Sequence, residues 1–369
     1  MNCSSYNIKV PGKLMIAGEY AVLEPNHKAV VIAVNRYIHA IIEPSEKNRI
    51  FIPQLGLMNI AWEINDGKVK FNVDDCRLNF IANSISAVHQ YLEEQMVKPM
   101  PFKIMIRSEL DDPSTGKKYG LGSSAAIVVS VVTAILRLNR RKNEAPSLDE
   151  IFKLSAIAHI KTQNTGSGAD IAASVYGGWL QYSAFSVDWI TSELEQQKKL
   201  IAIVNQKWPN LLILPITSPK ELQLVVGWTK SAISTAPMIK NVHDFKAENL
   251  EAYNDFLIES SAAVNRMLRS FKINDCAGAI ISLTENRNAL KRLGERSNIN
   301  IETAALRALC NAAERFGSGK SSGAGGGDCG IAFLNGYKHA EELLNVWEKE
   351  GILPLDLQVS RSGASIKHI

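Results

Sequence analysis

Cysteine is scarce in this chain of 369 residues, and no two of its five cysteines form a C-x-x-C pair. They are odd in number and widely scattered, at Cys3, Cys76, Cys276, Cys310 and Cys329. This pattern argues against a disulfide framework and against a cysteine-based zinc site, and it is typical of reduced thiols. We therefore expect a cytoplasmic protein.

Long hydrophobic segments and blocks of like charge are also missing. The most apolar run, Ala125–Leu136, is too short to cross a bilayer and indicates a buried helix, and the N-terminal "MNCSSYNIKV" lacks the apolar core of a signal peptide. Lysine and arginine number 41 against 37 acidic residues, without any block of five like charges. We therefore expect no membrane or nucleic-acid partner, although a local basic cleft for an anionic metabolite remains open, as does the oligomeric state.

The spacing of apolar residues indicates strands and helices throughout the chain. Ser147 and Glu150 form a capping box that opens a helix through about Ile160, and the apolar run after Ser123 predicts another. Residues 241–316 should be mostly helical. The remaining expectations are a helix at 79–95, strands at 29–34 and 37–43 (paired, or one bent strand), strands at 102–108 and 222–229, and late strands in "DCGIAFLN" and "LDLQVSR" around a helix at about 337–350.

Strands and helices thus occur in both halves of a chain that is too long for one comfortable core. We expect an α+β protein of two domains, residues 1–218 and 219–369, which meet near Pro215–Pro219. The cleft between the domains is the expected site.

The segment "KKYGLGSSAA" predicts a phosphate site where a glycine-rich turn leads directly into a helix. The first N–H groups of a helix are unsatisfied and carry partial positive charge, and glycines let the backbone approach an anion. An ordinary capped core helix is the alternative. A dinucleotide fingerprint is improbable, because a polar loop precedes the segment and a basic stretch follows the helix. The candidate residues are Gly120, Leu121, Gly122, Ser123, Ser124, Ala125 and Ala126.

The segment "FGSGKSSGAGGGDCG" resembles a P-loop only superficially. A P-loop needs glycine at position 314, where this chain has Glu314, and it follows a strand, whereas an apolar helical stripe precedes this segment. The three consecutive glycines Gly325–Gly327 instead predict close approach of the backbone to a ligand, and a flexible linker is the weaker alternative.

Two further residues are candidates for chemistry. Asp170, in "NTGSGADIAAS", could complete a capping box with Ser167, or it could be an ionised carboxylate that acts as a general base or electrostatic partner. Lys13 follows Pro11-Gly12 in a turn between apolar segments, and taken alone it would be interpreted as a surface lysine.

Three segments in this order, "KVPGKLMIAGEYAVLEP", "GLGSSAA" and "SSGAGGGDCG", resemble the superfamily named for galactokinase, homoserine kinase, mevalonate kinase and phosphomevalonate kinase (GHMP). The resemblance covers nearly the whole chain. It implies an N-terminal α/β domain and a C-terminal ferredoxin-like domain. It also implies that "GLGSSAA" holds the phosphates of ATP, with Ser124 as a Mg²⁺ ligand.

"GEYAVLEP", "KYGLGSSAA", "SVYGGWLQY", "VVGWTKSAIST" and Asp328 look closest to the branch of this superfamily that phosphorylates phosphomevalonate. That branch moves the γ-phosphoryl group of ATP onto 5-phosphomevalonate in the mevalonate route to isoprenoids, giving ADP and 5-diphosphomevalonate. Mevalonate kinase or another small-molecule kinase of the superfamily is the first alternative. A non-catalytic ATP-binding regulatory protein is an alternative of another class, and the related decarboxylase of the same pathway is disfavoured.

The resemblance implies that Lys13 and Lys118 neutralise charge on the donor and acceptor phosphates. Asp170 takes the place of the proposed base of mevalonate kinases. An acceptor phosphate dianion has no proton to lose, however, so Asp170 could instead orient Lys13 or hold Mg²⁺ beside Ser124. The upstream glutamate ligand of mevalonate kinases is missing, because residues 151–169 contain no acid, and His159 in that region is expected to be a packed helix residue.

The acceptor in this interpretation carries its own phosphate and a carboxylate, so cations and hydroxyl groups should gather on its side of the cleft. The substrate-side candidates are Lys9, Ser167, Lys230, Ser234 and Arg287, together with the third motif, Gly323, Ala324, Gly325, Gly326, Gly327 and Asp328.

Overall fold

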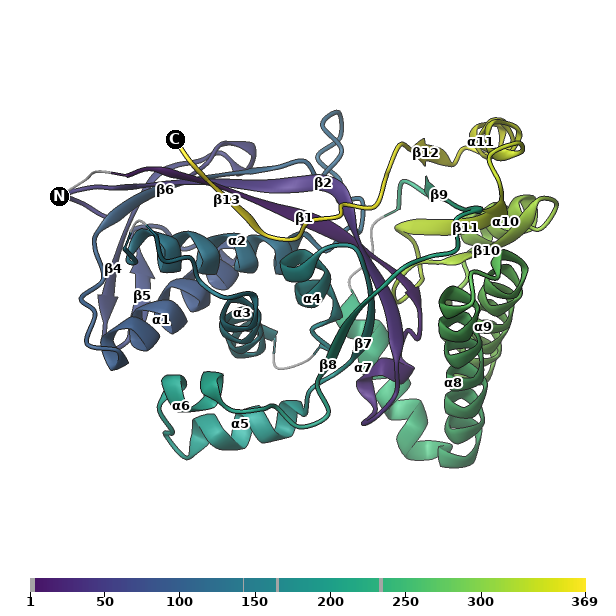
Figure 1. Ribbon diagram of the computed structural model, residues 1–369, viewed down its shortest axis with the longest axis horizontal. Coiled ribbons are helices and arrows are strands. Elements are labelled where there is room, and N and C mark those ends of the chain that lie inside the picture. The colour runs from purple at the N-terminus through teal and green to yellow at the C-terminus, as the bar shows by residue number, and fades with distance from the viewer. Residues whose placement is uncertain (1–3, 142, 164–165, 232–234) are drawn as a thin grey trace.

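The computed structural model describes residues 4–141, 143–163, 166–231 and 235–369 (Figure 1). Its larger sheet has the strand order β13-β1-β2-β6-β3-β4-β5, and β7 and β8 extend it from β2. The strands are β1 (Tyr6–Ala17), β2 (Ala29–Pro44), β3 (Arg49–Ile52), β4 (Leu57–Asn65), β5 (Lys68–Phe71), β6 (Phe102–Ser108), β7 (Trp179–Ser183), β8 (Leu212–Ile216) and β13 (Ser365–His368).

Helices cover one face of this sheet (Figure 1). The apolar helix α2 packs against β1 and β2, and α4 packs beside it on β1. Buried aliphatic side chains from both layers form one continuous core. The helices of this half are α1 (Asn79–Glu94), α2 (Ser123–Leu138), α3 (Leu148–Gln163), α4 (Ala169–Tyr176), α5 (Val187–Glu195) and α6 (Leu200–Asn205), with short 3₁₀ turns η1 (Ala21–Leu23), η2 (Pro53–Leu55) and η3 (Cys76–Leu78).

The two apolar runs near the start of the chain form one strand, β2, instead of a pair of strands. Pro11 of β1 pairs with Tyr37 and Gly12 pairs with Val34, so Asn35 and Arg36 are extra residues that bulge from β2. Lys13 follows directly after this irregularity on β1.

The smaller sheet is antiparallel, with the order β10-β11-β9-β12. In chain order its strands and flanking helices form a β-α-β-β-α-β pattern, which confirms the expected ferredoxin-like arrangement. The elements are β9 (Leu222–Trp228), α7 (Thr235–Glu248), α8 (Leu250–Lys272), α9 (Cys276–Ser297), α10 (Ala304–Ala313), β10 (Gly317–Ser321), β11 (Cys329–Asn335), α11 (Ala340–Lys349) and β12 (Leu353–Leu355).

The end of the chain returns to the larger sheet (Figure 1). Strand β13 pairs antiparallel with β1, and the Ser360 N–H donates to the carbonyl of Ala33 at 2.9 Å. The domain division at residues 218 and 219 remains a prediction. The C-terminal segment follows this division in the sequence but pairs with the larger sheet of the first half.

The late strands differ from the expectation in two places. Gly317–Ser321, for which no strand was predicted, is strand β10; a Cβ at Gly319 would lie 2.8 Å from that of Ala313, so glycine allows α10 to pack closely on the strand. "LDLQVSR" contributes only Leu355 to a named strand and Val359 to an isolated bridge with Val34, because the chain leaves the smaller sheet there.

Among the helices that the structure describes, none combines the length and apolarity needed to cross a membrane.

Candidate functional site

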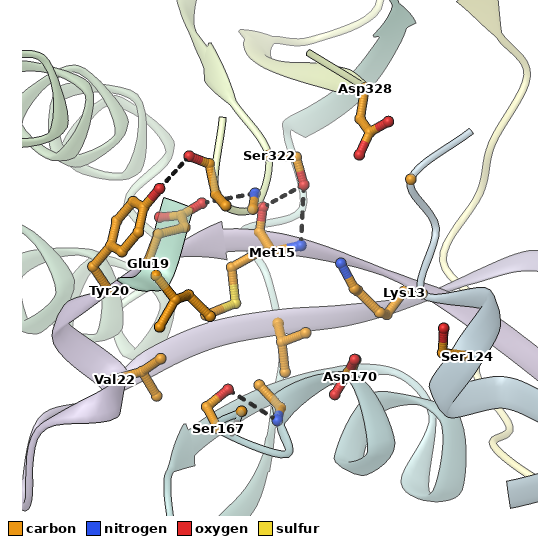
Figure 2. Close-up of a pocket in the computed structure, with 18 of the residues that line it drawn as sticks. Lys13, Met15, Glu19, Tyr20, Val22, Ser124, Ser167, Asp170, Ser322 and Asp328 are labelled. Atoms are coloured by element: carbon orange, nitrogen blue, oxygen red, sulfur yellow. Dashed lines mark hydrogen bonds between the residues drawn. The ribbon is translucent and has the colours of Figure 1, made fainter. Parts of the chain in front are cut away.

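A cavity of about 530 Å³ lies where the two sheets meet. Its walls come from β1 and the turn after it, the start of α2, the end of α3, the start of α4, and the glycine-rich loop between β10 and β11 (Figure 2). The predicted site residues that line it are Lys13, Lys118, Gly120, Gly122, Ser123, Ser124, Ser167, Asp170, Gly323, Ala324, Gly325 and Asp328.

The start of α2 has the geometry of an anion site. Gly122 is the N-cap residue with φ 76°, in the left-handed region, and no described side chain caps the helix. The first N–H groups of α2 are therefore left for a ligand, beside the hydroxyl groups of Ser123 and Ser124 at the cavity wall. Leu121, Ala125 and Ala126 are buried beneath this surface, so their side chains contribute packing.

Lys13 is held tightly against the turn Gly120–Gly122 that leads into α2. Its backbone N–H donates to the carbonyl of Leu121 at 2.9 Å, and a Cβ at Gly122 would lie 2.9 Å from Lys13 Cγ. The absence of a side chain at position 122 is thus what lets the lysine pass beside the helix start. Its ammonium group enters the cavity (Figure 2).

Two carboxylates approach Lys13 from opposite sides. Figure 2 shows Asp328 above the lysine and Asp170 below it, with Ser124 beside Asp170. Asp328 packs directly on the turn before α2, since a Cβ at Gly120 would lie 2.5 Å from Asp328 Cβ. Lys13 therefore has a negatively charged side chain on each side of it within the cavity wall.

Local packing fixes Asp170. It lies in the first turn of α4 after Gly168 (φ 73°), and the Ser174 hydroxyl donates to the carbonyl of Pro11 at 2.9 Å, which ties α4 to β1 two residues before Lys13. The buried Tyr182 hydroxyl donates to the Ser167 carbonyl. Burial, and then the negative charge of Asp170, raise the pKa of Tyr182 well above its usual range, so the phenol stays a donor.

The glycine-rich loop is attached to β1 and to the loop before α10. Ser322 Oγ accepts from the Met15 N–H at 3.1 Å and donates to the Met15 carbonyl at 2.9 Å. The Gly326 N–H donates to the Ile301 carbonyl at 2.7 Å. Gly323, Ala324 and Gly325 line the cavity, whereas Gly326 and Gly327 do not.

Besides Gly326 and Gly327, three substrate-side candidates do not line the cavity. The Lys9 ammonium lies 3.7 Å from the centroid of the Tyr37 ring. Lys230 has φ 63°, and its carbonyl accepts from Lys117 Nζ at 3.5 Å. Arg287 is buried and donates to Glu302, Glu314 and Asn311, so its charge is already balanced inside the second half. Ser234 lies outside the described residues.

Other lining residues were not predicted as site residues. His159, expected as a packed helix residue, lies at the cavity wall with its ring centroid 5.1 Å from that of Phe80. Glu19 and Tyr20 belong to the first motif, but their contacts with Gly323 and Ala324 join segments far apart in the chain and leave no local signal. The unpredicted lining residues are Met15, Glu19, Tyr20, Val22, Leu23, Val31, His159, Gln163, Gly166, Ala169, Ile239 and Ser322.

Comparison with known proteins agrees with this geometry. Residues 79–178 match the family described as GHMP kinases N terminal domain, and residues 276–353 match GHMP kinases C terminal. A phosphomevalonate kinase from Streptomyces sp. (strain CL190) is 31% identical, with 96% of each chain covered. A mevalonate kinase from Pyrococcus horikoshii is 25% identical, with 97% of each covered.

The chain belongs to the GHMP kinase family. Within that family its fold is very similar to the Streptococcus pneumoniae phosphomevalonate kinase solved in complex with phosphomevalonate and AMPPNP. The TM-score is 0.83 at 27% identity, covering 96% of this chain and 99% of that one.

Proposed function

We propose that this chain is a phosphomevalonate kinase, which transfers the γ-phosphoryl group of ATP to 5-phosphomevalonate. One observation carries the proposal of phosphoryl transfer. The uncapped start of α2, Lys13, Lys118 and the glycine-rich loop all line the same cavity. The choice of acceptor is supported by the higher identity to a phosphomevalonate kinase, 31%, than to the mevalonate kinase, 25%.

The catalytic problem is the charge that gathers when two phosphate groups approach each other. Fixed N–H groups and cations that face the transferred group stabilise this charge without reorganisation during the reaction. The start of α2 would hold the donor phosphates, and Lys13 and Lys118 would bridge toward the acceptor. Asp170 would hold Lys13 in line, because an acceptor phosphate dianion has no proton for a base to remove.

The residues also suit Mg²⁺. Magnesium takes oxygen ligands and binds through one or two protein groups together with phosphate oxygens and waters, and it neutralises phosphate charge when bound. Ser124 and Asp170 offer a hydroxyl and a carboxylate on the same side of Lys13 (Figure 2). The described residues hold no cluster of three or more His, Cys, Asp or Glu side chains, so a dedicated all-protein cage is not the arrangement here.

A reducing, cytoplasmic location is part of this proposal. The cysteines that the structure describes, Cys76, Cys276, Cys310 and Cys329, are free, and burial raises the pKa of the Cys310 thiol to about 12, which keeps it protonated and unreactive.

ADP release measured in a coupled assay tests the acceptor. We expect turnover with 5-phosphomevalonate and little with mevalonate at matched concentrations, since mevalonate lacks the phosphate that would accept the γ-phosphoryl group and bind the cations of the cavity. Faster turnover of mevalonate would replace the proposed acceptor, and ATP binding without transfer to any acceptor would replace the enzyme with a binding protein.

A further inference from the structure

A charged pair is buried between the two halves of the molecule, behind the glycine-rich loop. The ammonium of Lys320, on β10, donates to Glu19 in the turn after β1, although the two residues are 301 positions apart. The side chains are 0% and 2% exposed. A fully desolvated lysine is costly unless it is paired and hydrogen-bonded, so its presence here needs a reason.

The contacts of the pair lead directly to the loop. Lys320 also donates to the Ser321 carbonyl at 2.6 Å, at the point where β10 ends. The same carboxylate oxygen of Glu19 accepts the Gly323 N–H at 3.3 Å, and the neighbouring Tyr20 hydroxyl donates to the Ala324 carbonyl at 2.5 Å (Figure 2). Consecutive loop residues are therefore held by consecutive residues of the first motif.

We propose that Lys320 is a positioning residue for phosphoryl transfer, which acts through Glu19 to fix the glycine-rich loop relative to Lys13 and the start of α2. The inference rests on the proposed function for its kinetic consequence. Lys13 lies on β1 and Glu19 lies in the turn directly after this strand, so a contact that ties the loop to Glu19 also sets the distance of the loop from Lys13. Transfer between two phosphates depends steeply on such distances.

The alternative is that the pair only fills space and holds the halves together. The two explanations predict different results for a variant that lacks both charges. Removing both charges leaves no unpaired buried ion, so the variant should fold. In Glu19→Gln/Lys320→Met the amide oxygen of residue 19 can still accept from Gly323, the methionine fills the volume of the lysine, and the ionic tether is lost. A space-filling pair would tolerate this exchange without loss of catalysis.

The experiment compares wild type, Lys320→Met and the double variant by melting temperature, affinity for AMPPNP, kcat and KM, and amide hydrogen exchange of residues 322–328. We expect the single variant to melt much lower. The double variant should recover most of the melting temperature and bind AMPPNP as wild type does. Its kcat should remain about tenfold to a hundredfold lower, with faster exchange in the loop.

Lys153→Met is the matched control. Lys153 is also a buried lysine, and it donates to the carbonyls of Val204 and Gln206 at 2.8 Å and pairs with Asp149, but it does not line the cavity. This variant should melt lower than wild type with unchanged kcat and unchanged loop exchange.

Wild-type kcat and wild-type loop exchange in the double variant would overturn the proposal. Should the double variant fail to fold, Tyr20→Phe removes one hydroxyl from the same contact set and should also speed exchange at residues 322–328; unchanged exchange and kcat there would overturn it equally. Loop exchange does not depend on the acceptor, so a wild-type chain that phosphorylates another compound would refute the proposed function and leave this test intact.

Discussion

At the scale of single residues, the proposed site centres on Lys13 and the two carboxylates on either side of it. Asp170 and Asp328 come from segments far apart in the chain and reach the lysine from opposite sides (Figure 2). Under the proposed function, this arrangement would orient the ammonium by charge, which gives Asp170 a role in a reaction that needs no base.

Replacement of Asp170 by asparagine tests this role. We expect Asp170→Asn to lower kcat about tenfold to a hundredfold, because under the proposed function Lys13 would lose a nearby negative charge and Mg²⁺ would lose a ligand. Steady-state assays with varied Mg²⁺ would measure the loss, which should be smaller at high Mg²⁺ if the carboxylate helps to hold the metal. Asp188→Asn is the control, since Asp188 also lies in the first turn of a helix, α5, away from the cavity. Near-wild-type turnover of Asp170→Asn would eliminate both roles.

Ser124 and Asp170 could be selected from local chemistry, because one follows glycines at a helix start and the other is an acid in a first turn. Lys13 was selected only through the resemblance of its segment to a family motif. The pairing of Glu19 with Lys320 could not be predicted from the sequence. Lys320 sits in a "GSGKSS" segment whose letters indicate a polar loop, and only strand pairing with β11 and burial against a residue 301 positions away show that it is part of the interior. Pairings at such separations leave no periodic signal in the sequence.

At the scale of elements, the proposed phosphate site is the start of α2 together with the loop that leads into it. Two glycines with similar backbone angles allow a clean test. Gly122 has φ 76° and a Cβ there would meet Lys13 at 2.9 Å, whereas Gly116 has φ 68° and nothing within 4 Å.

Gly122→Ala should therefore do more than strain the backbone. Both Gly122→Ala and Gly116→Ala should lose about 1–2 kcal/mol of stability from the left-handed angle. Only Gly122→Ala should displace Lys13 and weaken ATP binding, with the KM for ATP raised about tenfold or more. Thermal unfolding and ATP titrations would separate the two effects; equal KM values for both variants would contradict the placement of the donor phosphates at this helix.

The polar loop before α2 has its own anchor, Asp112. Hydrogen bonds from the side chains of Thr115 and Ser114 lower the pKa of Asp112 to about 2, from an ordinary value of 3.8. A carboxylate whose pKa is depressed by folding adds stability above its unfolded pKa, and this contribution is lost as the pH falls through the folded value.

The pH dependence of the stability of Asp112→Asn follows from this lowered pKa. At neutral pH the variant should melt below wild type, because the loop from Leu110 to Tyr119 loses its charged acceptor. The difference in melting temperature should shrink as the pH falls from about 5 toward 2, where wild type loses the same charge. A difference that stays constant over this range would show that the carboxylate does not anchor the loop.

At the scale of the whole molecule, motifs from distant parts of the chain meet at one cavity, and the fold class and the family were predictable because those motifs occur in a fixed order. The return of the C-terminal segment to the larger sheet was not. "LDLQVSR" has the alternation of a strand, but most of it crosses between sheets, where the Gln358 N–H donates to Asn35 Oδ1 at 2.8 Å, beside the bulge in β2.

Removal of residues 356–369 should therefore destabilise the larger sheet. We expect a lower melting temperature and a lower kcat, because β1 loses its outer neighbour β13 and the bulge opposite Gly12 loses its support. A chain that lacks only Ile369 is the control. Wild-type stability and kcat in the longer truncation would show that the returning segment is dispensable.

The central claim is that the start of α2 holds the phosphates of ATP, between Lys13 and the glycine-rich loop. The most direct measurement is a crystal structure of this chain with AMPPNP, Mg²⁺ and 5-phosphomevalonate. We predict the γ-phosphate at the N–H groups of Ser123 and Ser124, with Lys13 between the two ligands. A triphosphate bound elsewhere, with the start of α2 unoccupied, would contradict the account.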